Sequence, residues 1–179
     1  MKILVLLIAA VTLGVGFWSA LAPGVDAEQR AAIPDGPVRT SYIIDGIRRR
    51  FSEKGHPTDT LKIDSATRWL NSDQTALSGI QYVTSGNLGE IWDIRATDGV
   101  FFEDRNELAL TNGVVIDEHY QDARMTTQAM RLSMDQKLAT GEHRVVLTGR
   151  GSRTTGSAFR VDLRTNKATL IGDVQTNYE

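Results

Sequence analysis

From about Ser41 onward, apolar and polar residues alternate along the chain with a period of two. Phe159, Val161 and Leu163 are separated by charged residues, and the segment 130–134 alternates in the same way. Successive side chains of a β-strand point to opposite faces, so this pattern predicts half-buried strands. No segment after residue 25 sustains helical periodicity for three turns. The sequence therefore predicts an all-β body.

Short segments that contain glycine or asparagine mark the connections that we expect between antiparallel strands. The closing segment 167–178 alternates throughout, apart from Ile171, and predicts one terminal strand. The predicted turns are Lys54-Gly55, Asp98-Gly99, Asn112-Gly113 and Thr165-Asn166-Lys167.

The body also contains an internal repeat. Residues 127–134 align with residues 156–163 at an offset of 29, and alanines recur at positions 66, 96, 129 and 158. A unit of about 30 residues, two short strands, cannot bury its own apolar face and has to stack on its neighbours. Such a stack has two ends, where strand edges with unpaired backbone groups can accept another chain.

The amino-terminal segment differs in kind from this body. Residues Ile3 to Val25 form a run of 23 positions without a charge, and spanning a bilayer takes about 20 apolar residues as helix. We predict a transmembrane anchor over 1–25. The alternative is a cleaved signal peptide with Val25-Asp26-Ala27 as the processing site, although the uncharged run is longer than a typical signal core. Both interpretations export the body.

Three of the four prolines lie within residues 23–40, with Pro23 inside the run and Pro34 and Pro37 after it. Proline and glycine disfavour regular structure, so we expect a linker over 26–40 that separates the anchor from the domain over 41–179.

Composition excludes several functional classes. The chain has no cysteine, so neither disulfides nor thiolate chemistry contribute. A net charge of −2, with 20 basic and 22 acidic residues, gives no electrostatic footprint for nucleic acid. For the densest basic cluster, Arg48-Arg49-Arg50, a solvated strand or turn is the favoured interpretation over a phosphate or lipid-headgroup site.

No catalytic or metal-binding motif is present. His56, His119 and His143 lack paired ligand spacing. The acidic pairs Glu103-Asp104 and Asp117-Glu118, together with Glu142, could in principle serve a glycosidase, but strand ends and turns explain them more simply. We therefore predict that the protein is no enzyme and uses no cofactor or metal.

Several segments together resemble the LptC family, the bitopic inner-membrane component of the lipopolysaccharide export machinery. Besides the anchor, they are the segments 45–46, 51–55, 92–96, 110–116 and 124–132, and the closing segments 147–149, 156–159 and 167–179.

The resemblance implies a twisted, open antiparallel β-jellyroll behind a single amino-terminal transmembrane helix. It further implies a single-pass protein of the cell inner membrane with its carboxyl-terminal domain in the periplasm. Such a protein receives lipopolysaccharide from the subunits of an inner-membrane ABC transporter and passes it to a soluble periplasmic β-jellyroll bridge protein. The alternative function is a membrane-tethered β-sheet adaptor that assembles an envelope complex without binding lipid.

The apolar faces of the predicted strands supply candidates for a lipid groove, and closed core packing is the alternative for each. The carboxyl-terminal strand is the predicted partner-binding edge, through Ala168, Leu170, Val174 and Tyr178. The candidate groove residues are Gly46, Leu77, Leu108, Leu110, Val114, Ile116, Leu132, Met134, Val145, Leu147, Phe159, Val161, Leu163, Ala168, Leu170, Val174 and Tyr178.

Overall fold

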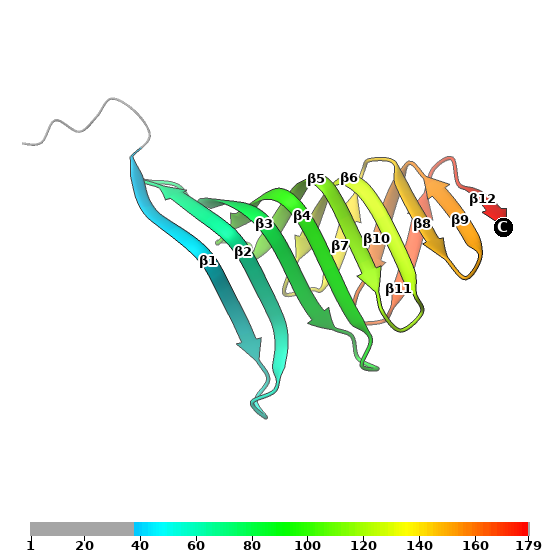
Figure 1. The fold of residues 1–179 in the computed structure, drawn as a ribbon, viewed down its shortest axis with the longest axis horizontal. Coiled ribbons are helices and arrows are strands. Elements are labelled where there is room, and N and C mark those ends of the chain that lie inside the picture. The colour runs from blue at the N-terminus through cyan, green and yellow to red at the C-terminus, as the bar shows by residue number, and fades with distance from the viewer. Residues whose placement is uncertain (1–37, 179) are drawn as a thin grey trace, which may run out of the picture. The chain divides into compact units, whose positions relative to one another are not determined.

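The computed structural model describes residues 38–178, and β-strands account for most of them (Figure 1). Within this part of the chain no helix is long and apolar enough to span a membrane. The predicted anchor over 1–25 and nearly all of the predicted linker lie outside the described residues. The strands are β1 (Arg39–Phe51), β2 (Pro57–Trp69), β3 (Gln74–Ser85), β4 (Ile91–Phe102), β5 (Glu107–Glu118), β6 (Ala123–Ser133), β7 (Leu138–Gly141), β8 (Val145–Gly149), β9 (Ser152–Gly156), β10 (Ala158–Asp162), β11 (Lys167–Ile171) and β12 (Gln175–Tyr178).

All twelve strands belong to one antiparallel sheet that forks at β6. Strands β1 to β6 are paired in chain order, as expected when consecutive strands are joined by tight turns. The amino-terminal half of β6 pairs with β8, and its carboxyl-terminal half pairs with β7. One branch continues as β7, β10 and β11, and the other as β8, β9 and β12. The prediction of an all-β, open antiparallel fold is confirmed.

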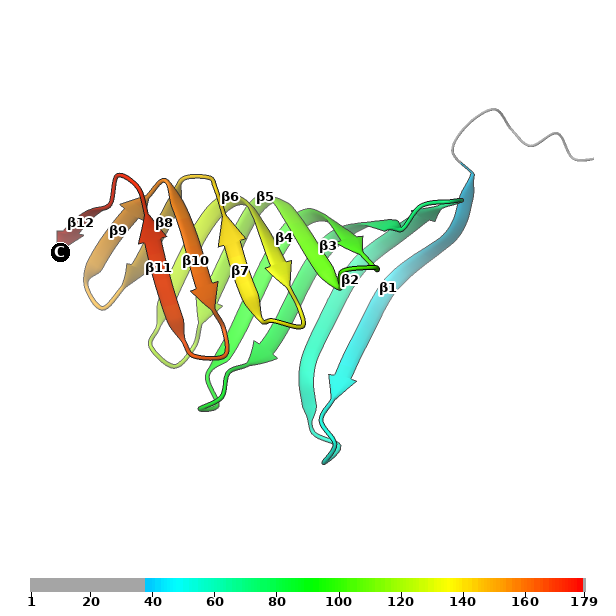
Figure 2. The same ribbon diagram turned by 180° about the vertical axis from the view of Figure 1, so that it is seen from behind.

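The two branches form two layers, because each long strand bends near its middle (Figures 1 and 2). We call the half that contains β8, β9 and β12 layer A, and the half that contains β7, β10 and β11 layer B. Segments 57–63, 80–85, 91–96, 114–118 and 123–127 belong to layer A. Segments 65–69, 74–78, 98–102, 107–111 and 129–133 belong to layer B.

In β1, β3 and β5, residues with positive φ lie where the strand bends. In β5 these are Asn112 and Gly113, at φ of 61° and 83°, and the ladder with β6 shifts register at this point. Glycine and asparagine tolerate this left-handed conformation best. The prediction that one strand ends and another begins at Asn112-Gly113 is therefore wrong. The pair lies inside β5 and bends this single strand from layer B into layer A.

The predicted single terminal strand over 167–178 is also interrupted. Gly172 and Asp173 adopt φ of 67° and 47°, so β11 ends in layer B and β12 begins in layer A.

Asp98-Gly99 is not a turn either, because both residues lie inside β4. A Cβ on Gly99 would come within 2.7 Å of Ile80 Cδ1 and 2.8 Å of the Ala109 carbonyl oxygen. This glycine is thus required by close packing. The turns predicted at Lys54-Gly55 and around Asn166 are confirmed.

Turns recur at regular intervals along each rim of the folded sheet. On the layer A rim they begin at residues 52, 86, 119 and 150, so one repeat of roughly 30 residues corresponds to one pair of strands. Segments 130–134 and 159–163, aligned in the sequence, occupy matching inward positions in β6 and β10, with alternate residues buried.

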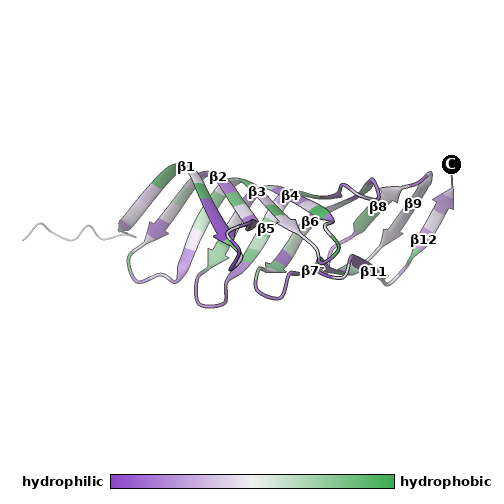
Figure 3. Cartoon of the chain, turned by 90° about the horizontal axis from the view of Figure 1, so that it is seen from below, coloured by the Kyte–Doolittle hydropathy of each residue, from purple (hydrophilic) through white to green (hydrophobic). Residues whose placement is uncertain are grey.

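The core lies between the two layers. Apolar and polar residues alternate along the strands (Figure 3), and the apolar ones point inward. Tyr82, Phe159 and Ile94 are the largest fully buried side chains. Gly141 makes room for Phe159, because a Cβ at this position would come within 2.3 Å of the ring.

Candidate lipid-binding interior and its mouth

Most of the predicted groove residues lie together in this interior. They are buried within one cluster and pack against each other. The fully or nearly fully buried members are Leu77, Leu108, Leu110, Val114, Ile116, Leu132, Met134, Val145, Phe159, Val161 and Leu163.

Register organises these side chains into rows that cross the strands. In layer A, directly paired residues form the row Leu61, Tyr82, Ile94, Ile116, Met125 and Leu147. In layer B, the corresponding row is Phe101, Leu108, Leu132, Ala139, Val161 and Ala168. Each row therefore runs along the sheet, from its amino-terminal to its carboxyl-terminal strands.

The remaining predicted groove residues lie near the two ends of these rows. Leu147 and Leu170 are half-buried against the core, and Gly46 is half-buried in β1. Ala168, Val174 and Tyr178 are exposed at the carboxyl-terminal end, with Tyr178 at 84%. The structure does not bring the partner-edge residues into one strand, since Ala168 and Leu170 lie in β11 and Tyr178 lies in β12.

The amino-terminal end of the interior opens into a cavity of about 430 Å³, which we call the mouth. Its walls are chiefly apolar and come from β1 to β4. Gly46 keeps β1 close to β2, because a Cβ there would lie 2.8 Å from Ile63 Cγ1. The lining residues are Ser41, Ile43, Gly46, Ile47, Arg48, Leu61, Ile63, Ala66, Arg68, Thr75, Leu77, Phe101 and Glu103.

Two arginines and one glutamate line the mouth. The guanidinium of Arg68 donates to both carboxylate oxygens of Glu103, at 2.8 and 2.9 Å. The Arg48 guanidinium lies 5.3 Å from the centre of the Phe101 ring, within the range of a cation–π contact. Among residues 38–178, no carboxylate lies within 4.0 Å of Arg48. Arg48 can thus offer its N–H donors to an anion at the rim of an apolar cavity.

The sequence prediction missed the exposed apolar residues of β1. Tyr42, Ile43, Ile44, Ile47 and Phe51 are each about half exposed, with Ile44 the most exposed at 65%. The signal for them was the consecutive Tyr42-Ile43-Ile44, which breaks the alternation expected of a strand with one wet face. β1 therefore presents apolar side chains at the edge of the sheet.

The candidate carboxylates are held in structural pairs. Asp117 accepts hydrogen bonds from Arg95 and Arg124 across the outer surface of layer A. Burial raises the pKa of the Asp117 carboxyl, but these hydrogen bonds and positive charges outweigh burial and leave the pKa below its ordinary value. Glu118 accepts from the backbone N–H groups of Tyr120 and Gln121, at 2.9 and 2.6 Å.

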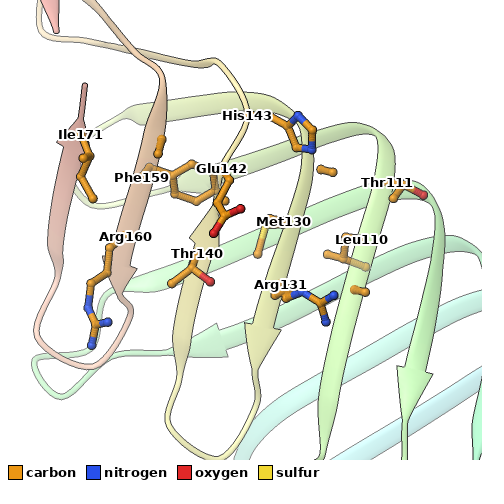
Figure 4. Close-up of a pocket in the computed structure, with 14 residues that line it drawn as sticks. Leu110, Thr111, Met130, Arg131, Thr140, Glu142, His143, Phe159, Arg160 and Ile171 are labelled. Atoms are coloured by element: carbon orange, nitrogen blue, oxygen red, sulfur yellow. The ribbon is translucent and has the colours of Figure 1, made fainter. Parts of the chain in front are cut away.

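A second cavity, of about 600 Å³, lies beside the bend between β7 and β8 (Figure 4). Glu142 and His143 stand on its upper side, while Arg131 and Arg160 lie lower on β6 and β10. A retaining or inverting glycosidase needs two carboxylates. Among the described residues lining this cavity, Glu142 is the sole carboxylate.

His56, His119 and His143 are exposed in separate connections. Within residues 38–178, no group of three histidine, aspartate or glutamate side chains is arranged to hold a metal ion.

No curated protein matches the sequence. The family model described as "Lipopolysaccharide-assembly, LptC-related" matches residues 3–179, which is nearly the whole chain, and the protein therefore belongs to this family.

Proposed function

We propose that the protein is a bridge component that receives lipopolysaccharide from an inner-membrane ABC transporter and passes it to a soluble periplasmic partner. Family membership supports a role in lipopolysaccharide transport. The observation that carries the finer proposal is the pair of apolar rows that begin at the mouth, with Leu61 in β2 and Phe101 in β4. The first row ends at Leu147 in β8 and the second at Ala168 in β11. In this function the lipid enters at the mouth and its acyl chains travel between the layers.

The chemistry of the mouth suits an anionic amphiphile. Each methylene moved out of water contributes about 0.8 kcal/mol, so acyl chains favour the cavity walls formed by Ile43, Ile47 and Leu77. Arg48 lies on the same cavity and can pair with a phosphate, which a guanidinium binds well. An apolar wall beside an arginine matches a lipid that carries phosphate next to its acyl chains.

The strand edges suit partners of the same architecture. Within residues 38–178, β1 pairs only with β2, β11 only with β10 and β12 only with β9. Their outer backbone groups are open to strand addition, which is a common mode of recognition. We assign the β1 edge to the transporter side and the β11–β12 edge, with Ala168, Leu170, Val174 and Tyr178, to the next periplasmic protein.

The cellular placement follows from the same proposal. The uncharged run over residues 3–25 anchors the chain in the inner membrane, and the β-sheet lies in the periplasm. The protein catalyses no reaction, so its partner supplies the energy for transport.

The test compares an apolar mouth residue with an apolar residue elsewhere. In full-length protein held in detergent micelles, we expect Ile47→Asp to weaken lipopolysaccharide binding at least about tenfold, equivalent to about 1.4 kcal/mol. The matched control is Tyr120→Asp, because Tyr120 is an exposed apolar residue in the turn after β5, outside the mouth. Equal binding by Ile47→Asp and the control would refute the assignment of the mouth.

The second candidate function is an adaptor that assembles the complex without binding lipid. The observation that favours it is the burial of the interior, where Leu108, Leu132 and Val161 have no exposed surface. An adaptor would co-purify normally with its partners and bind no lipopolysaccharide, so the binding measurement also separates the two functions.

A further inference from the structure

The two rims of the folded sheet meet along a line that we call the seam. On the layer A side it comprises the end of β1, the start of β2 and the turn at residues 86–90. On the layer B side it comprises the turns at residues 134–137 and 163–166. Neighbouring strands elsewhere are joined by ladders of backbone pairs, up to eleven in the case of β3 and β4. Across the seam, in the described part of the chain, a single backbone hydrogen bond forms, from Asn87 N–H to the Arg164 carbonyl oxygen at 3.0 Å.

Lys137 provides the deepest contact across the seam. Its ammonium group lies 3.5 Å from Asp59 Oδ1 and donates to the Ser85 carbonyl oxygen at 2.8 Å. A second ion pair joins Arg50 to Asp135 at 3.2 Å. The Lys137 side chain is 19% exposed and the Asp59 side chain 4%, so this contact is shielded from water far better than an ordinary surface pair.

Side chains of layer A fix the position of the Asp59 carboxylate. The carboxylate accepts hydrogen bonds from Tyr82 Oη at 3.0 Å and from Thr84 Oγ1 at 2.6 Å, and Arg50 lies 3.4 Å away. Tyr82 and Thr84 belong to β3 and fix the carboxylate in one position. The position of Asp59 therefore does not depend on layer B, whereas Lys137 reaches Asp59 only when the layers are together.

The backbone at Lys137 points to the same conclusion. Three four-residue turns on the layer B rim end in a residue with positive φ: Asn106 at 47°, Lys137 at 51° and Asn166 at 54°. Asparagine is enriched in this conformation and lysine is not. In the turn at residues 134–137, lysine thus occupies the position with positive φ, and its side chain faces Asp59. This is expected when a side-chain contact outweighs the preference of the turn for asparagine.

The packing of the interior explains why the two layers would have to separate. Between the mouth and the carboxyl-terminal end the rows are filled by buried side chains, so acyl chains can pass only if the layers separate. The bends on the opposite side are continuous backbone and cannot part. The seam is the line along which separation breaks the fewest contacts.

We propose that the seam is a latch, closed by the Lys137–Asp59 contact, which opens to let acyl chains into the interior. This inference rests on the proposed transport of lipopolysaccharide. It concerns how the interior is loaded and adds a moving boundary to the site.

The absence of cysteine from the chain allows a direct test. Asn87→Cys combined with Arg164→Cys places two thiols across the seam. Arg160→Cys combined with Thr169→Cys is the matched control, because these exposed residues are paired within layer B and do not cross the seam. The measurement is the rate at which fluorescent lipopolysaccharide loads into full-length protein in micelles, before and after oxidation.

We expect oxidation to slow loading at least tenfold in the seam pair, with recovery on reduction, and to leave the control pair unchanged. If the oxidised seam pair loads lipid as fast as the same protein before oxidation, the latch is overturned. Failure of wild-type and reduced proteins to load would instead refute the transport function, so the two failures are distinguishable.

A substitution at the latch itself tests the role of Lys137. Lys137→Asn introduces the residue found at the matching turn positions and removes the ammonium group, so the fold should persist. Lys62→Asn, at an exposed position in the middle of β2, makes the same charge change away from the seam. We expect faster loading and faster hydrogen exchange at residues 86–90 for Lys137→Asn alone. Loading and exchange rates equal to those of Lys62→Asn would show that Lys137 does not hold the seam.

Discussion

The middle of the sheet and its amino-terminal edge share the same strand geometry but differ in where their apolar side chains lie. In β5 and β6, inward residues such as Leu108 and Leu132 are fully buried, and outward residues are polar. In β1, apolar residues such as Ile43 and Ile44 occur on both faces and stay exposed. An apolar strand with neighbours on both sides therefore stabilises the fold, whereas an apolar strand at the edge offers contact surface to another molecule.

The largest expected difference concerns stability. Leu132→Ala removes a fully buried side chain, and we expect a loss of about 2–5 kcal/mol in the free energy of unfolding. Ile44→Ala in β1 should change it by less than about 0.5 kcal/mol. Urea denaturation followed by circular dichroism measures both. Similar losses would mean that β1 belongs to the core.

The next expected effect tests the buried carboxylate beneath the seam. Asp59→Asn should lower the free energy of unfolding by about 2–3 kcal/mol, because Lys137 and Arg50 lose a charged partner. Asp98→Asn, a change at a half-buried position inside β4 whose carboxylate accepts a hydrogen bond from Asn112, should have a much smaller effect. Equal effects would place the seam among ordinary surface contacts.

The same carboxylate predicts a pH dependence. Burial raises the pKa of Asp59, but hydrogen bonds from Thr84 and Tyr82 and the charges of Lys137 and Arg50 outweigh it, so the pKa falls below its ordinary value of 3.8. A lowered pKa contributes stability that is present above pH 3.8 and lost as the pH falls through the folded-state value. Acid unfolding should therefore show a shallower slope below pH 3.8 in Asp59→Asn than in the wild type.

Two glycines give a smaller contrast between the same regions. A Cβ at Gly99 would meet the Ala109 carbonyl oxygen, a backbone atom that cannot yield, so Gly99→Ala should cost about 1–3 kcal/mol. A Cβ at Gly46 would meet only the side chains of Ile63 and Ile43 at the mouth. Gly46→Ala should cost less, and thermal unfolding of the two variants provides the comparison.

Local patterns predicted the strands well. The alternation in segments 130–134 and 159–163 placed Leu132 and Val161 on the inward face, and the structure buries both completely. A period of two reports which face of a strand is apolar and needs no knowledge of distant residues.

Bends and long-range contacts could not be predicted in this way. Asn112-Gly113 has the composition of a hairpin turn, and only the continuing ladders on both sides show that it bends one strand. Asp59 and Lys137 are far apart in the chain, and their contact depends on the register of all the strands between them. Whether an apolar residue lies in a closed core or an open mouth depends on the same register.

The fork at β6 makes the two ends of the sheet unlike. One end is a single strand, β1, of 13 residues, whereas the other presents β11 and β12, of five and four residues, on either side of a bend. Pairing of β1 in one module with the β11–β12 end of the next would be a heterologous interface, which repeats head to tail. A chain of modules joined in this way has a polarity, with a β1 edge at one end and a β11–β12 edge at the other.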